Sequence, residues 1–153
     1  MSAESKLVEL GLQLPPIPKP GGVYKPVVIV GNMAYCSGHV SVRSDGSIMT
    51  GRVGSEVDQD YGKKAAEGCG LALLATLRAN LGSLDRVKRV VKTLGMVNST
   101  ADFTNHPEVI NGCSELWKRI WGDEHGVGAR SAVGMGSLPR NSTVEIEAIF
   151  ELA

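Results

Sequence analysis

Hydrophobic residues recur at intervals of three and four positions over a long segment in the middle of the chain. The stripe begins near residue 57, ends near residue 81, and consists of Val57, Tyr61, Ala65, Cys69, Ala72, Thr76 and Asn80, flanked by Leu73, Leu77 and Leu81. This spacing predicts a long amphipathic helix, because residues three and four apart share one helix face. Ser55 is the expected N-cap, and Gly82 is expected to end the helix.

A second helical pattern covers roughly residues 107 to 121. Pro107 suits the first helical position, where no backbone N–H is needed, and Asn105 or His106 is expected to cap it. The apolar residues repeat with the same helical spacing, and the predicted buried stripe is Val109, Ile110, Cys113, Leu116, Trp117 and Ile120. We therefore expect two long helices, each with one buried face.

The N-terminal part of the chain has a different character. Residues 4 to 12 have the pattern of a short helix, and residues 15 to 22 are rich in proline and glycine. Proline removes backbone donors, so this second stretch cannot form regular structure. We expect residues 1–21 to be an extension and connector, and residues 22–153 to form a single domain.

Four further segments have the pattern of β-strands. Residues 27–30 and 33–37 are mostly apolar and flank Gly31-Asn32, which predicts a hairpin with a tight turn. Residues 86–97 carry apolar side chains on both faces, which is typical of a strand with neighbours on each side. A short strand is also expected near residues 47–50, after the Asp45-Gly46 turn.

The C-terminal segment predicts a pair of strands joined by a short turn at Leu138–Asn141. After the turn, apolar residues occupy every second position: Val144, Ile146, Ala148, Phe150 and Leu152. The order of elements is therefore strand pair, helix, strand, helix, strand pair. This order predicts an α+β sandwich with two helices packed against one sheet.

Composition and charge exclude several classes of partner. The 153 residues include 16 Lys and Arg and 16 Asp and Glu, so the formal net charge is zero. A nucleic-acid partner is not expected, because phosphate binding usually needs a clustered surplus of basic residues. Cys36, Cys69 and Cys113 are odd in number and widely spaced. With no signal peptide or membrane span expected, they indicate reduced thiols in a cytoplasmic protein.

Motifs for metal, nucleophilic and dinucleotide chemistry are missing from the sequence. The three histidines, His39, His106 and His125, are far apart, and no Cys or His pair has the spacing of a zinc site. There is no G-x-S-x-G nucleophile elbow, and Gly134-Met135-Gly136 lacks the remainder of a dinucleotide loop. We therefore expect neither a metal nor another cofactor.

Arg130 is the charged residue in an otherwise small and apolar stretch that begins the C-terminal strand pair. One interpretation is an arginine paired with a glutamate on a solvated strand face, which residue types alone favour. The other is a ligand site, because a guanidinium holds a carboxylate through two parallel hydrogen bonds and does not lose its charge.

Several short motifs occur in order along roughly residues 22 to 152. They are Tyr24 ahead of Gly31-Asn32-Met33, Ser37-Gly38, Val109-Ile110-Asn111, Ala129-Arg130-Ser131, Leu138-Pro139 and Val144-Glu145-Ile146-Glu147-Ala148. This ordered set resembles the RidA/YjgF family of reactive-intermediate (enamine/imine) deaminases, also labelled endoribonuclease L-PSP. The resemblance implies a chorismate-mutase-like (bacillus type) two-layer sandwich with a mainly antiparallel sheet. It also implies a homotrimer around a central barrel, with pockets between subunits.

The resemblance also implies an activity and a set of site residues. Arg130 is expected to hold the carboxylate of a 2-imino acid, and Glu145 to position or activate water for hydrolysis to a 2-keto acid and ammonia. Other residues are expected to line the pocket: Tyr24, Ser37, Gly38, Asn111 and Ala132. Glu147 is expected to point the same way as Glu145 and to be structural.

The chain departs from the best-known deaminases of the family, so other functions stay open. Those enzymes have a cysteine at the position of Ala132, a glutamate at Gly134, and Phe-Pro where this chain has Val127-Gly128. A ligand-binding or regulatory trimer with little turnover is therefore one alternative. An endoribonuclease is another, disfavoured by the zero net charge and the lack of a basic stripe.

Overall fold

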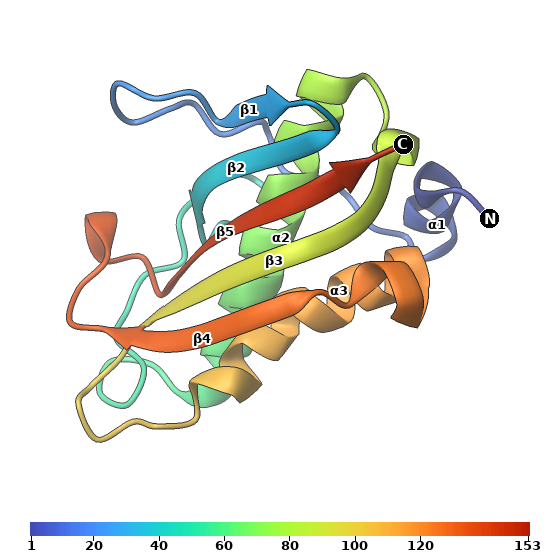
Figure 1. Cartoon of the computed structure of the whole chain (residues 1–153). Coiled ribbons are helices and arrows are strands. Elements are labelled where there is room, and N and C mark those ends of the chain that lie inside the picture. Colours follow the sequence, from blue (N-terminus) through green and yellow to red (C-terminus); the bar gives the residue numbers. More distant parts are fainter.

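A five-stranded sheet forms one layer of the structure, with the strand order β1-β2-β5-β3-β4 (Figure 1). The computed structural model describes residues 1–153, and its strands are β1 (Val27–Val30), β2 (Met33–Val40), β3 (Val87–Asn98), β4 (Ala129–Met135) and β5 (Val144–Leu152). Every neighbouring pair is antiparallel except β3 and β4, which run parallel. The predicted α+β class with a mainly antiparallel sheet is confirmed.

Two long helices, α2 (Gln59–Leu81) and α3 (His106–Gly126), pack against each other and against one face of the sheet (Figure 1). On β5 the even-numbered residues from Val144 to Leu152 are buried beneath them, while the odd-numbered residues lie on the opposite, open face. A third, short helix, α1 (Ala3–Glu9), packs against α3. The prediction of two helices on one face of the sheet is therefore confirmed.

The C-terminus of α2 agrees with the prediction, and its N-terminus differs. Gly82 adopts a left-handed conformation with φ of 84° and ends α2 as expected. The N-cap is Asp58, not Ser55, and its side chain accepts a hydrogen bond from a backbone N–H of the first turn at 2.8 Å. A bridge between Val53 and Val57 holds the preceding residues out of the helix, which explains the later start.

Helix α3 begins as predicted but continues beyond the expected end. Asn105 is its N-cap, although without a side-chain hydrogen bond, and Pro107 lies in its first turn. Gly122 has a non-helical backbone with φ of 78°, close to where the helical pattern ends, and the remaining residues form an additional turn. The kink coincides with a residue that has no Cβ to oppose it.

The predicted C-terminal hairpin is wrong. Strands β4 and β5 do not pair, because β3 lies between them and pairs with both. Helix α3 carries the chain from β3 across to β4, which is why these two strands are parallel. The expected turn is instead a single 3₁₀ turn at Pro139–Asn141, within a longer connection to β5.

The first strand pair is longer than predicted. The β1–β2 hairpin turns at Gly31 with φ of 60°, as the Gly-Asn signal indicates, but β2 continues to Val40 through an irregularity between Cys36 and His39. The strand expected near residues 47–50 is reduced to isolated bridges at Ile48 and Thr50.

The core lies between the sheet and the two long helices. Its centre includes Trp117, whose ring packs edge-on against Phe150 at a centroid distance of 5.2 Å. Cys36, Cys69 and Cys113 are free thiols buried in this core, and burial raises the pKa of Cys36 to about 12. None of the helices has the length and apolar character needed to cross a membrane.

Candidate functional site

The predicted site residues form two groups in a single chain. Tyr24, Ser37, Gly38 and Glu145 line a cavity of about 700 Å³, here called the connector cavity, whose walls are the proline-rich connector, β2 and the turn before β5. The second group contains Arg130 and lies between β4 and α3, beside a smaller cavity of about 260 Å³ that Asn111 also lines.

Glu145 lies directly over Gly38 in the connector cavity. A β-carbon at position 38 would be 2.7 Å from Oε2 and 2.9 Å from Cδ of Glu145. Gly38 belongs to the irregular part of β2, and the pairing resumes with His39 opposite Ile146 and Val40 opposite Glu145. The Ser-Gly step therefore has a geometric role, since only glycine leaves room for the carboxylate in this position.

The Glu145 carboxylate is half-buried and has no ionic partner. No Lys, Arg or His nitrogen lies within 4.0 Å of it, and burial raises the pKa of its carboxyl above the ordinary value. The neighbouring Glu147 carboxylate is a second, smaller cause of the raised pKa. An unpaired carboxylate with a raised pKa in a cavity is a stronger proton acceptor than an exposed glutamate.

Ser37 fastens the residues that follow the connector to β2, and Tyr24 closes a turn at the end of the connector. The Ser37 hydroxyl donates to the carbonyl oxygen of Lys25 at 2.7 Å, and its backbone N–H donates to that of Pro26 at 2.9 Å. Tyr24 is 48% exposed, and its hydroxyl oxygen accepts the backbone N–H of Gly21 at 3.1 Å. Both side chains therefore shape the cavity wall through contacts with the backbone.

His39 is a member of this site that sequence reasoning considered only as a metal ligand. It is buried, with Nδ1 at 2.7 Å from the carbonyl oxygen of Ser37 and Nε2 at 2.8 Å from Oγ1 of Thr76. The carbonyl can only accept, so Nδ1 carries the proton and Nε2 accepts from the threonine hydroxyl. Burial lowers the pKa of His39, in agreement with a neutral ring that fixes the backbone just before Gly38.

Arg130 is held by neutral groups. Its guanidinium donates to Oδ1 of Asn111 at 2.7 Å, to Oγ of Ser114 at 3.1 Å and to the carbonyl oxygen of Pro107 at 3.4 Å. Asn111 is itself oriented by donating to Oε2 of Glu108 at 3.2 Å. No carboxylate oxygen lies within 4.0 Å of Arg130, so the interpretation of a glutamate-paired arginine is wrong. Ser114 carries no signal in the sequence, because its partner Arg130 lies on another element.

Arg130 and Glu145 lie on opposite faces of the sheet. Thr93 of β3 is the register partner of both Arg130 and the buried Ala148, so Arg130 emerges on the face covered by helices. Glu145 alternates with the buried Val144 and therefore emerges on the open face. One chain consequently does not bring the two side chains together.

Two of the positions at which the chain departs from the familiar deaminases, Ala132 and Gly134, lie on the same side of β4 as Arg130. Ala132 is partly buried against the core. A β-carbon at Gly134 would lie 2.5 Å from Nε2 of His106 and 2.9 Å from Oγ of Ser99, whose side chains are 3.3 Å apart. The imidazole of His106 thus occupies the space that a longer residue at position 134 would need.

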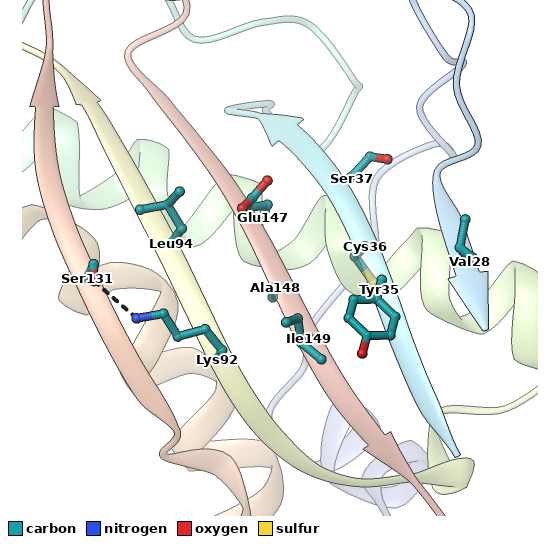
Figure 2. Close-up of a pocket in the computed structure, with 10 residues that line it drawn as sticks. All are labelled: Val28, Tyr35, Cys36, Ser37, Lys92, Leu94, Ser131, Glu147, Ala148 and Ile149. Carbon is teal, nitrogen blue, oxygen red and sulfur yellow. Dashed lines mark hydrogen bonds between the residues drawn. The ribbon is translucent and has the colours of Figure 1, made fainter. Parts of the chain in front are cut away.

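A second hollow lies on the open face of the sheet, where Glu147 is located (Figure 2). Across this hollow, Nζ of Lys92 donates to Oγ of Ser131 at 3.1 Å. Glu147 projects from the same face as Glu145, as predicted, but it does not line the connector cavity. Ser37 lines both hollows. No group of three or more His, Cys, Asp and Glu residues is arranged to hold a metal ion.

Comparison with known proteins gives a consistent result. Residues 4–152 match the family described as "YjgF/chorismate mutase-like, putative endoribonuclease". The chain is 39% identical over 148 residues to Protein TCP17 of Trypanosoma cruzi, with 97% of this chain and 92% of that protein covered. It is 27% identical over 142 residues to the 2-iminobutanoate/2-iminopropanoate deaminase of Dermatophagoides farinae, covering 90% and 92%.

The structure is also similar to a crystal structure, that of the protein Atu1372 from Agrobacterium tumefaciens. The TM-score is 0.88 with 43% sequence identity, and the match covers 98% of this chain and 91% of that one.

Proposed function

The chain belongs to the YjgF/chorismate mutase-like family, and from this premise we propose that it hydrolyses small 2-imino acids, or their enamine tautomers, to 2-keto acids and ammonia. The observation that carries the proposal is the half-buried, unpaired carboxylate of Glu145 over Gly38, with its raised pKa. The deaminase name of the relative from Dermatophagoides farinae supports the same reaction class.

Glu145 is the proposed general base. It takes a proton from water as the water oxygen bonds to the imine carbon, and the electrons of the C=N bond move to nitrogen. Glu145 then returns this proton to nitrogen, which gives a carbinolamine. The proton of the carbinolamine hydroxyl passes through Glu145 to the amine nitrogen as the C=O bond forms and the C–N bond breaks, and the keto acid and ammonia leave. No redox step is involved, and 2-imino acids are reactive enough for positioning and modest proton transfer to suffice.

Arg130 is the proposed carboxylate ligand. Its guanidinium is oriented by Asn111 and Ser114, and it has no anionic partner within the chain. A substrate carboxylate would add a charge-assisted, bidentate contact to these neutral ones. Because Arg130 and Glu145 emerge from opposite faces, we propose that neighbouring subunits of a homotrimer combine the two groups into one pocket. Ala132 would line it beside Arg130, and Tyr24, Ser37 and Gly38 beside Glu145.

The substituted positions favour a ligand-binding or regulatory trimer as the second candidate. The His106 side chain fills the space beside Gly134, and this changes the pocket wall next to Ala132. Such a protein would bind 2-keto acids without accelerating imine hydrolysis. An endoribonuclease has less support, because the net charge is zero.

One assay separates these candidates. 2-Iminobutanoate is generated in place by an amino acid oxidase, and its disappearance is followed with and without the protein. Acceleration above the spontaneous rate, lost in Glu145→Gln, is the expected result. Tight binding of 2-oxobutanoate without acceleration would replace the deaminase with the regulatory trimer. Cleavage of RNA that falls steeply with added salt would indicate the ribonuclease.

A further inference from the structure

The connector cavity contains two basic side chains that the proposed reaction does not use. Arg140 lines it from the turn before β5, and Lys19 lines it from the proline-rich connector. Glu145 is the cavity's only acidic residue, and neither cation lies within 4.0 Å of any carboxylate. Two cations facing a cavity without anionic partners indicate a place for a negative charge from elsewhere.

The backbone of Arg140 is unusual for a side-chain-bearing residue. Its φ and ψ are 54° and 28°, and Asn141 follows with φ of 56°. An arginine in the left-handed region is destabilised relative to glycine, and such conformations persist where surrounding contacts impose them. An ordinary surface turn has no need of arginine at this position.

Contacts of the flanking residue impose the conformation. Oδ1 of Asn141 accepts from Asn98 at 3.0 Å, its Nδ2 donates to Oε2 of Glu56 at 3.4 Å, and its carbonyl oxygen accepts the N–H of Gly51 at 3.0 Å. The backbone is thus held from several sides, while the Arg140 side chain stays exposed. The turn therefore fixes the backbone of Arg140 and leaves its guanidinium available to a ligand.

The opposite wall is also restrained. Lys19 lies between Pro18 and Pro20, whose rings limit the backbone on both sides. Further along, Tyr24 accepts the backbone N–H of Gly21 at the end of the connector, and Ser37 of β2 donates to the carbonyl oxygen of Lys25. Lys19 and Arg140 are therefore carried on two separately restrained walls of the same cavity.

We propose that Arg140, assisted by Lys19, binds a second carboxylate on the substrate, at the end distant from the imine. The proposal rests on the proposed function, and it makes 2-imino dicarboxylic acids the preferred substrates among the 2-imino acids. Glu145 would act at the imine carbon, Arg130 of a neighbouring subunit would hold the first carboxylate, and the distal carboxylate would extend toward Arg140.

A carboxylate fits this place better than a phosphate does. Phosphate sites commonly use several backbone N–H groups, often at a helix N-terminus. Here Pro18, Pro20, Pro26 and Pro139 line the cavity, and none of them has a backbone N–H. One guanidinium fork matches the two oxygens of a carboxylate.

The test compares two keto acids of similar shape by calorimetric titration of the full chain. 2-Oxoglutarate carries the distal carboxylate, and 5-methyl-2-oxohexanoate has a neutral branched end in its place. We expect the wild-type protein to prefer 2-oxoglutarate, and Arg140→Gln to reduce that preference by about tenfold to a hundredfold. Binding of the neutral analogue should not change. Lys19→Gln should have the same effect to a smaller extent.

Two further variants keep the test decisive. Arg140→Gly removes the side chain and suits the left-handed backbone, so it should fold and lose the preference as well. Lys64→Gln removes an exposed cation of α2 outside the cavity and should leave the preference intact. Equal affinity of the wild-type protein for both keto acids, with hydrolysis of 2-iminobutanoate intact, would reject the distal site alone. Binding of neither keto acid would reject the proposed function itself.

Discussion

Gly38 and Glu145 are in such close contact that position 38 has no room for a methyl group: the added carbon would lie 2.7 Å from the carboxylate oxygen. We therefore expect Gly38→Ala to displace the Glu145 carboxylate while leaving the fold intact, since Glu145 is at the end of a flexible side chain. A displacement of about 1 Å can lower turnover about a hundredfold.

The measurement is kcat for imine hydrolysis together with the thermal unfolding temperature. Gly136→Ala is the matched control, because a β-carbon there would meet nothing within 4 Å. Unchanged turnover in Gly38→Ala would show that the position of the carboxylate over Gly38 has no part in catalysis.

His106 and Gly134 are also in close contact, and we expect a change at either position to affect the stability of the protein. A β-carbon at position 134 would lie 2.5 Å from Nε2 of His106, so Gly134→Ala should destabilise the protein by about 1–3 kcal/mol through overpacking. His106→Ala should create space and largely rescue Gly134→Ala. A double-mutant cycle from urea unfolding measures this coupling. Additive effects of the two substitutions would mean that the backbone relaxes and the two sites are independent.

The sequence predicts most of the helices and strands, but not which strands lie next to each other in the sheet. The helical spacing predicts α2 and α3, because a repeat of apolar residues every three to four positions can be recognised within one segment of the chain. Alternation on β5 likewise identified which residues are buried. It could not show that β5 inserts between β2 and β3, since strand pairing between distant segments leaves no local signal. The C-terminal hairpin was expected for this reason.

The same limit applies to the site. The family motifs identified Arg130 and Glu145, but their projection from opposite faces depends on the register of β3 with both strands. The contact of His106 with Gly134 joins the start of α3 to β4 and explains a departure that the sequence alone left open. The sequence does not predict His39 as a positioning group, because its partner Thr76 lies on α2, far from β2 along the chain.

The raised pKa of Glu145 predicts a pH dependence. A general base works only when ionised, so turnover should rise with pH as Glu145 loses its proton, with a midpoint above the ordinary glutamate value of 4.5. Glu147→Gln removes one cause of the raised pKa, so it should move the midpoint to lower pH. Profiles of kcat against pH, corrected for spontaneous hydrolysis, provide the measurement. An unchanged midpoint in Glu147→Gln would show that the pH profile reports the ionisation of a group other than Glu145.

The same carboxyl should affect stability in the opposite direction. Because its pKa is higher in the folded state, its protonated form favours folding, and this stabilisation is lost as pH rises through the folded pKa. Glu145→Gln should therefore raise the unfolding temperature near pH 7 but not near pH 4. An equal effect at both pH values would mean that charge is not the cause.

Replacement of Arg130 should impair ligand binding, whereas replacement of Glu145 should impair turnover. Arg130→Ala should lose binding of 2-oxobutanoate, since truncating one partner of a buried charge pair costs about 2–5 kcal/mol. Glu145→Gln keeps shape and hydrogen bonding but not the base, so affinity should persist while turnover falls about a hundredfold to ten-thousandfold. Arg119→Ala, an exposed arginine of α3 paired with Glu67, is the control for loss of a cation. Equal loss of binding in both site variants would make Glu145 a binding group instead of a base.

The two inactive variants also test whether the site lies between subunits. In one chain Arg130 and Glu145 emerge from opposite faces of the sheet, so a site that needs both must take them from different copies. If Arg130→Ala and Glu145→Gln chains are unfolded together and refolded in equal amounts, about a quarter of the sites in a cyclic homo-oligomer should contain both native residues. Activity should return to that fraction of the wild-type value, and sedimentation should give the mass of a trimer. Each variant, unfolded and refolded alone, controls for activity gained by refolding. If activity does not return although trimers form, both residues must act within one chain, and the inter-subunit pocket is wrong.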